Sequence, residues 1–211
     1  MTVAQPTPDL TGALPDRPLR LVGAGAPVDR ARVEEAVREL LADPERDTTD
    51  EPLRDTPRRV ADAYAELLTP RTFSLTTFPN DEGYDELVLA KGIPFHSLCR
   101  HHLLPFTGVA HVGYLPGERI IGLSKLARVV EMFARDLQVQ ERLTQQVANW
   151  LQEHLAPTGV GVVMEAEHLC MSLRGVQVDG SRTVTSALHG LLRTDPRSRA
   201  EFFALATGTR P

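Results

Sequence analysis

Both cysteines of this chain lie beside histidines, in the segments Cys-Arg-His-His at 99–102 and His-Leu-Cys at 168–170. Thiolate and imidazole together form the ligand set that suits zinc. Cysteines placed in this way indicate metal binding more strongly than cysteines scattered along a chain. The sequence therefore predicts one metal site that is assembled from these two segments.

The spacing within each segment has geometric consequences. Cys99 and His102 are three residues apart, so that a single turn could direct both side chains at one ion. His168 and Cys170 are two apart, and on a strand they would share a face. Three protein ligands would leave a position open for water, as in catalytic sites, whereas four would close the site. Spacing does not decide which histidine binds, but a surplus histidine would be free for proton transfer.

Three other interpretations of the cysteines are open. Buried cysteines often serve as small hydrophobic residues. Cys99 and Cys170 could form a single disulfide, although two cysteines are too few for a disulfide framework. A closed structural zinc site is the third interpretation. The neighbouring histidines favour the metal site.

A second group of candidate residues lies in the segment Gly-Leu-Ser-Lys-Leu-Ala-Arg at 122–128. We expect Ser124 to cap a helix whose first turns carry Lys125 and Arg128. Cations at a helix start oppose the helix dipole unless an anion lies between them. Backbone N–H groups, a hydroxyl and two cations would together form a phosphate pocket. The alternative is that both cations are simply solvated.

Two further charged residues have both a structural and a functional interpretation. Glu141 lies early in the next predicted helix, where a carboxylate complements the helix dipole, but it could also accept two N–H bonds from a planar base. Arg174 follows Cys170 by four residues, so it is either a surface arginine or an anion-binding group beside the metal.

Helices and strands that would position these residues follow from apolar periodicity. A helix is predicted from an N-cap at Asp29, and another from Thr56 with Pro57 at its first helical position. The acidic segment 43–55 between them is expected to be a loop. Strands are predicted at 87–89, 93–98, 108–114, 160–173 and 176–187, two helices between the third and fourth strands, and a last helix at 196–205.

The order of these elements predicts an α+β fold with an antiparallel sheet. The two helices between the strand groups have a short join and should pack antiparallel. We expect a disordered, proline-rich N-terminal tail at 1–27, a helical region at 28–86 and a catalytic region with a C-terminal helix at 87–211. A chain of 211 residues is long enough for one domain with a full core.

Composition excludes several classes of protein. The net charge of −5 argues against a broad nucleic-acid footprint, so no nucleic-acid partner is expected. No apolar run approaches the roughly 18 residues of a membrane span, and no secretory signal is visible. We therefore expect a cytoplasmic protein with no membrane partner.

Several longer strings resemble the GTP cyclohydrolase I family over about residues 55–203. They are CRHHLLPF at 99–106, IGLSKLAR at 121–128, QVQERLT at 138–144, EHLCM at 167–171 and TPRRV at 56–60. The resemblance implies the tunnelling fold, an antiparallel sheet with helices packed on one face, and a homodecamer with active sites at subunit interfaces. It implies hydrolytic ring opening of GTP, release of formate and reclosure to 7,8-dihydroneopterin triphosphate, the first step of folate or pterin biosynthesis.

The resemblance also implies a role for individual residues. The Zn²⁺ ligands of the family fall on Cys99, His102 and Cys170, and its acid/base histidines on His101 and His168. The guanine-binding pair falls on Gln140 and Glu141. Triphosphate contacts fall on Ser124, Lys125, Arg128 and Arg174, with Arg59 contributing.

One residue departs from the family pattern, since Arg100 stands where the family usually has Glu. An outward Arg100 would change little, whereas an inward one could meet a thiolate or a phosphate.

The alternative functions are those of a non-catalytic, zinc-dependent assembly protein and of a pathway-specialised paralogue, for instance in deazapurine biosynthesis. A zinc deaminase would need H-x-E and P-C-x-x-C, and the sequence contains neither. A nitrile reductase of the same fold would need a cysteine that does not bind metal, which the neighbouring histidines disfavour.

Overall fold

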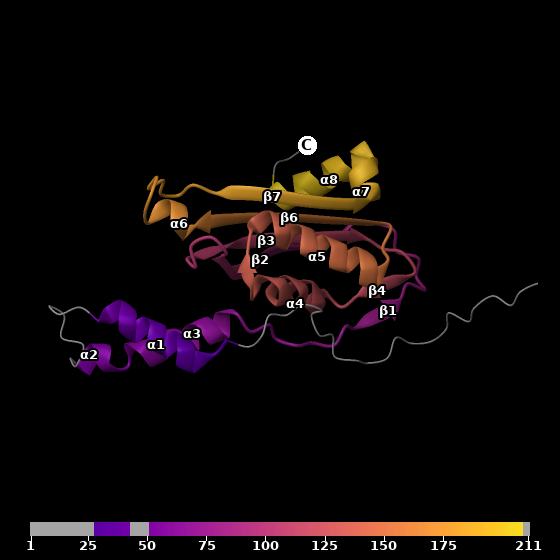
Figure 1. Ribbon diagram of the computed structural model, residues 1–211. Helices are drawn as coiled ribbons and strands as arrows, with labels where there is room; N and C mark the ends of the chain where they lie inside the picture. Colours follow the sequence, from indigo (N-terminus) through magenta and orange to yellow (C-terminus); the bar gives the residue numbers. More distant parts are fainter. Residues whose placement is uncertain (1–27, 43–50, 209–211) are drawn as a thin grey trace, which may run out of the picture.

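The computed structural model describes residues 28–42 and 51–208, which form the predicted α+β fold (Figure 1). The expected tail at 1–27 lies outside the described residues, as does 43–50. The helices are α1 (Arg30–Leu41), α2 (Glu51–Arg54), α3 (Thr56–Leu67), α4 (Leu123–Ala134), α5 (Gln140–Leu155), α6 (Leu169–Ser172), α7 (Leu191–Thr194) and α8 (Pro196–Thr207). The strands are β1 (Thr77–Pro79), β2 (Val88–Cys99), β3 (Pro105–Leu115), β4 (Arg119–Ile121), β5 (Leu137–Gln138), β6 (Gly159–His168) and β7 (Thr183–Gly190).

A five-stranded sheet in the order β5-β2-β3-β6-β7 forms the centre of the molecule. Its four long strands pair antiparallel, and only the short β5 runs parallel to its neighbour β2. The register aligns Leu98 with Pro105 and Phe106 with His168, so β2 and β6 end on either side of the start of β3. A separate pair, β1 with β4, leads into α4.

Helices α4 and α5 cover one face of this sheet (Figure 1). The inward side chains of both helices and of alternate strand residues form the main core, in which Phe106, Leu126 and Val147 are fully buried. Helix α4 ends where β5 begins, and α5 then returns over the same face, in agreement with the predicted antiparallel pair. Among the described residues no helix is both long and apolar enough to cross a membrane.

Helices α7 and α8 lie on the opposite face, which corrects the expectation that helices pack on one face only. Their core is centred on Phe202, whose ring lies over Gly113 and Gly161. These two glycines are register partners on β3 and β6. A pair of residues without side chains leaves the space that the aromatic ring fills.

The N-terminal helices form a layer of their own in which α1 packs on α3. Asp29 caps α1 as predicted, because its carboxylate accepts from Arg32 N at 3.2 Å. Pro57 lies buried in the first turn of α3. The Tyr64 hydroxyl donates to the Leu103 carbonyl at 3.0 Å, which ties α3 to the loop between β2 and β3.

Four predicted segments differ from the structure. The strand predicted at 160–173 ends at His168, because the chain turns there into α6, and the strand predicted at 176–187 begins only at Thr183. Within the segment predicted as a loop, 51–54 is the short helix α2, while 43–50 lies outside the described residues. The expected helical region 28–86 also contains β1.

The contact between Gly161 and Phe202 predicts a stability effect. A Cβ at Gly161 would lie 2.7–2.9 Å from three atoms of the Phe202 ring, so Gly161→Ala should destabilise the fold by about 1–3 kcal/mol, the usual cost of overpacking. Phe202→Leu should relieve this clash, so the double variant should lose less than the sum of the single losses. Thermal unfolding with Gly113→Ala as the matched, milder control measures this, and simple additivity would contradict the contact.

Candidate functional site

Cys99, His102 and Cys170 form a group that could hold one metal ion, with ligand atoms all within 4.8 Å of one another. The two Sγ atoms are 4.0 Å apart, and Cys99 Sγ lies 3.5 Å from His102 Nδ1. Ligands about 2.0–2.3 Å from a tetrahedral ion are separated by roughly 3.5–3.8 Å. The spacing of these donors therefore fits one tetrahedral ion.

The electrostatics of the two thiols also favour a cation. Burial raises the pKa of the Cys170 thiol, and the neighbouring Cys99 raises it further, while Arg174 acts in the opposite direction. Two thiolates at this distance in a buried site repel each other, and a metal ion removes that cost by coordinating both. The donor set and its surroundings thus fit a divalent metal.

The ligands Cys99 and His102 are placed by a tight loop that joins β2 to β3. Cys99 N donates to Leu104 O at 2.8 Å, and Leu103 N donates to Cys99 O at 2.8 Å. Leu103 adopts the left-handed conformation, with φ 56°, which is strained for a leucine. Such strain persists where surrounding bonds impose it, and here the hydroxyl of Tyr64 binds the Leu103 carbonyl.

Cys170 reaches the group in a different way from the one expected. It lies in the one-turn helix α6 rather than on a strand, since β6 ends at His168. Because the chain turns into α6 after His168, the side chains of His168 and Cys170 point in different directions. Cys170 Sγ faces Cys99, while His168 Nε2 faces Gln140.

The adjacent histidines of the β2–β3 loop have different surroundings. His101 is exposed, and its Nδ1 lies 3.9 Å from Cys99 Sγ, but only His102 belongs to the group with both thiols. Arg100 is exposed, and among the residues that the structure describes its side chain makes no ion pair. The charge at this departure from the family pattern therefore faces solvent.

His168 is held on two sides. Its Nε2 lies 2.7 Å from Gln140 Oε1, and its ring stacks on Phe106 with centroids 4.5 Å apart and planes 3° apart. Burial lowers the pKa of His168, and the nearby carboxylate of Glu141 partly opposes this shift. The ring therefore lies in a fixed orientation within the range of a carboxylate.

The guanine-binding candidates open helix α5, and their environments differ sharply. Gln140 is 1% exposed, and its amide is bonded within the protein, whereas Glu141 is exposed. Arg174 is also close, since its Nη1 donates to Cys170 O at 3.4 Å. The structure thus brings Glu141, His168 and Arg174 together around the metal group.

Ser124 was wrongly predicted as the N-cap of α4. The cap is Gly122, with φ −60° and ψ 126°, because Lys125 N donates to the Gly122 carbonyl and the helix begins two residues earlier, at Leu123. Gly122 N in turn donates to Thr76 O, which fixes the entry of the chain from the β1–β4 pair. Ser124 therefore lies inside the first turn, with an exposed side chain.

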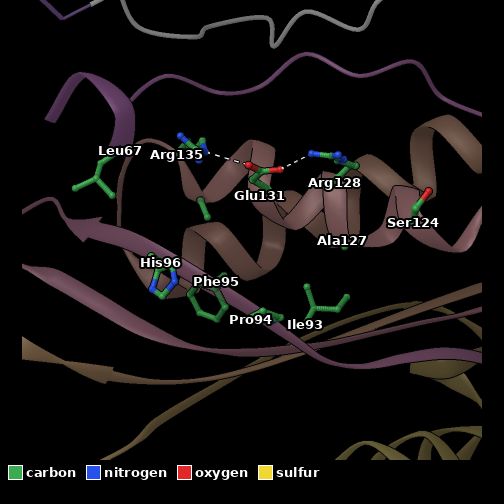
Figure 2. A pocket seen from close by; sticks show the side chains of 11 residues that line it. Leu67, Ile93, Pro94, Phe95, His96, Ser124, Ala127, Arg128, Glu131 and Arg135 are labelled. Atoms are coloured by element: carbon green, nitrogen blue, oxygen red, sulfur yellow. Dashed lines mark hydrogen bonds and ion pairs between the residues drawn. The ribbon is translucent and has the colours of Figure 1, made fainter. Parts of the chain in front are cut away.

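Ser124 and Arg128 line a pocket of roughly 480 Å³ between α4 and β2. Figure 2 shows Arg128 and Arg135 on either side of the Glu131 carboxylate, with N–O distances of 3.1 and 3.2 Å. Arg71 binds the same carboxylate at 3.3 Å. None of the three metal-group residues lines this pocket.

Ser124 and Lys125, which are predicted to bind phosphate, lie at the opposite end of α4 from the group of Cys99, His102 and Cys170. Ala134, at its C-terminal end, accepts a bond of 2.7 Å from Ser97 Oγ, two residues before Cys99. Ser124 lies ten residues earlier on the helix, about 15 Å away at 1.5 Å per residue. Within one chain, Ser124 and Lys125 are therefore a helix length from the metal end.

Arg59 stands apart from both groups. It lies on α3, exposed, and pairs with Asp55 at 3.6 Å.

The sequence interpretation missed Phe106, Thr144 and Thr185, which surround the Gln140–His168 pair. Phe106 ends the family-like segment at 99–106, so the sequence offered a signal for it. The position of Thr185 depends on the register of β6 with β7, for which the sequence has no local signal.

Comparison with known proteins gives one consistent result. The GTP cyclohydrolase I family model matches residues 33–207. The GTP cyclohydrolase 1 of Aquifex aeolicus is 49% identical over 86% of this chain and 98% of its own length, and that of Mycolicibacterium vanbaalenii is 54% identical over 82% and 88%. The Deinococcus radiodurans GTP cyclohydrolase 1 is 48% identical over 97% of this chain and 91% of its own. This chain belongs to the GTP cyclohydrolase I family.

Proposed function

We propose that this chain hydrolyses and rearranges GTP to 7,8-dihydroneopterin triphosphate and formate, as the first step of folate or pterin biosynthesis. The observation that carries the proposal is the group of Cys99, His102 and Cys170 beside His168 and Glu141, in a member of this family. These residues offer a metal, a proton-transfer group and a carboxylate for the base within one region.

Zn²⁺ is the ion that we assign to Cys99, His102 and Cys170, because two thiolates and an imidazole are typical zinc ligands. Three protein ligands leave a coordination position open, as in catalytic sites. When bound, zinc supplies Lewis acidity and lowers the pKa of a water molecule, which makes attack on C8 of guanine feasible near neutral pH.

His168 and His101 are the proposed proton-transfer residues. His168 protonates the imidazole nitrogen of the guanine ring in the opening step, and its orientation is fixed by Gln140 and Phe106. His101, exposed beside the ligand loop, handles the later proton transfers. A positioned acid or base contributes about 10²–10⁴-fold to the rate.

Glu141 is the proposed guanine anchor. Its carboxylate can accept both the N1–H and the 2-amino group, a bidentate contact that adenine cannot make. Gln140 was expected to share this role, but its side chain is already bonded within the protein. Its contribution to guanine binding is therefore confined to the backbone at the start of α5, where N–H groups are free of intrahelical partners.

The triphosphate is the proposed partner of the cationic residues. Ser124, Lys125, Arg128, Arg174 and Arg59 would offset its charge of about −4 through charge-assisted hydrogen bonds. The separation of Ser124 and Lys125 from the metal end supports a site that is shared between subunits. We infer a homo-oligomer, a decamer, in which α4 of one copy completes the site of another.

The tunnelling fold accounts for how copies of this sheet would assemble. Among the residues that the structure describes, β2 is paired over most of its length only on its β3 side, and β7 is the last strand at the other edge. Unpaired strand edges are templates for pairing with another chain. We propose that the sheets join edge to edge into a barrel-like ring, and that the enzyme works in the cytoplasm.

Metal content should follow the ligands rather than the acid/base residues. We expect about one zinc per subunit, with Cys170→Ser and His102→Ala losing both metal and activity. His101→Ala and His168→Ala should retain zinc while turnover falls by at least ~10². Metal analysis and formate release measure these outcomes. A metal-free protein with full activity, or an empty site in His101→Ala only, would overturn the assignment.

Base and phosphate recognition should separate by mutation. Glu141→Ala should weaken GTP binding and reduce the preference for GTP over ITP, since a hydrogen bond to a charged group contributes about 1.5–3 kcal/mol. Lys125→Ala should weaken binding of GTP but leave the affinity for guanosine unchanged. Steady-state kinetics and competition by guanosine test this, and unchanged GTP affinity in Lys125→Ala would remove Lys125 from the phosphate pocket.

Mixed oligomers test whether the site is shared. Coexpression of Lys125→Ala with Cys170→Ser should restore activity to about a quarter of the wild-type level, because random assembly unites two intact halves in about one site in four. The matched control is His168→Ala with Cys170→Ser, which damages the same half twice and should remain inactive. Failure of the first pair to recover would show that each chain forms its own site.

A further inference from the structure

We propose that Gln140 is a positioning residue that holds His168 as its Nε2–H tautomer and leaves Nδ1 to exchange the proton with the substrate. The inference deepens the proposed function, on which it rests for the role of His168. It also gives the Gln140 side chain a task other than guanine binding.

The orientation of the Gln140 amide follows from its acceptors. Its Nε2 lies 3.1 Å from Met164 O and 2.9 Å from Thr183 O, and both are backbone carbonyls that can only accept. A flipped amide would place Oε1 against these two oxygens with no proton between them. The NH₂ group therefore faces the carbonyls, and Oε1 faces His168 at 2.7 Å.

Two threonines supply an independent check on this orientation. Thr144 Oγ1 donates its single proton to Gln140 O at 2.8 Å. The 2.6 Å contact between Thr144 and Thr185 hydroxyls must then be donated by Thr185. Thr185 Oγ1 is left as the acceptor for Gln140 Nε2 at 3.2 Å. Every proton in this chain of bonds thus has one direction.

The donor and acceptor roles in this hydrogen-bond network decide which ring nitrogen of His168 carries the proton. Because Gln140 Oε1 can only accept, His168 Nε2 must carry the proton that it donates. Within the described residues Nδ1 has no hydrogen-bond partner, and in the neutral ring it carries the lone pair. Stacking on the fully buried Phe106 fixes the plane of the ring. Nδ1 is therefore the atom at which His168 takes up or releases a proton.

Burial argues against direct guanine recognition by the Gln140 side chain. Gln140 and Thr144 are each 1% exposed. The two amide protons already serve three acceptors, and Oε1 holds a short bond. A base would have to break this buried network to reach the side chain, whereas the exposed Glu141 is free to bind it.

Kinetics of Gln140→Met in the full-length, zinc-loaded protein tests the proposal. Methionine has a similar length and cannot hold His168, so kcat should fall by about 10- to 100-fold, the usual loss when an orienting partner is removed. The KM for GTP and the preference for GTP over ITP should stay within about twofold of wild type. Gln145→Met, on the exposed side of the same helix, is the matched control and should retain activity.

A double variant separates positioning from general damage. Gln140→Met should cost nothing further in a His168→Ala background, because residues that act as a unit are not additive. A raised KM with altered GTP:ITP preference, or a full additional loss in the double variant, would overturn the proposal. His168→Ala that turns over GTP like wild type would instead remove the proposed role of His168 itself.

A spectroscopic measurement covers the case in which Gln140→Met fails to fold. Solid-state ¹⁵N spectra of histidine-labelled wild-type protein, compared with His168→Ala, identify the two ring nitrogens of His168. We expect a protonated Nε2 and an unprotonated Nδ1 in the neutral ring. The opposite tautomer would refute the proposal without any variant at Gln140.

Discussion

The arrangement of the site depends on one constraint, that two buried thiols lie 4.0 Å apart. Burial and mutual repulsion disfavour a pair of thiolates there unless a cation is bound. The sheet imposes this proximity, because β2 and β6 both flank β3 and end at the same level: Leu98 pairs with Pro105, and Phe106 pairs with His168. The loop after β2 and the turn of α6 after β6 then direct Cys99 and Cys170 at each other. The sheet register is therefore what creates the metal site.

The same register organises the surroundings of His168. Met164 on β6 pairs with Thr185 on β7, and this brings the acceptors for Gln140 together under the start of α5. After α4, the chain forms the short strand β5, which pairs parallel with the end of β2 at Leu98 and Cys99. Helix α5 follows β5 and therefore begins close to Cys99. A buried amide with all its partners satisfied is stable, whereas one with a missing partner is costly. The network thus specifies a single placement of the helix start.

The sequence predicts the residue types of the metal-binding group but not the contacts that depend on long-range strand pairing. Composition and spacing predicted a Cys/His metal group, and the structure brings Cys99, His102 and Cys170 together, although spacing alone left the choice of histidine open. Placing Cys170 on a strand failed because nothing local marks the exit of the chain from the sheet after His168. The Thr185 contact depends on pairing between β6 and β7, and such long-range register has no local signal. Similarly, the ring of Phe202 needs two glycines that lie far apart in the sequence, so periodicity could not place α8 on the second face.

A chain with a net charge of −5 needs a local device to attract a polyanion, and α4 provides one. Lys125 lies in the first helical turn, where the helix dipole disfavours cations, and Arg128, one turn further on, adds a second positive charge nearby. Glu131 offsets part of this cost, since its carboxylate binds Arg128 and Arg135 (Figure 2). Arg71 also binds this carboxylate. In the proposed enzyme the triphosphate would take over this compensation for Arg128, because phosphate oxygens accept the same guanidinium bonds and suit a helix N-terminus. Glu131 would still hold Arg135 and Arg71, so the packing of α4 against the rest of the chain would not depend on the substrate.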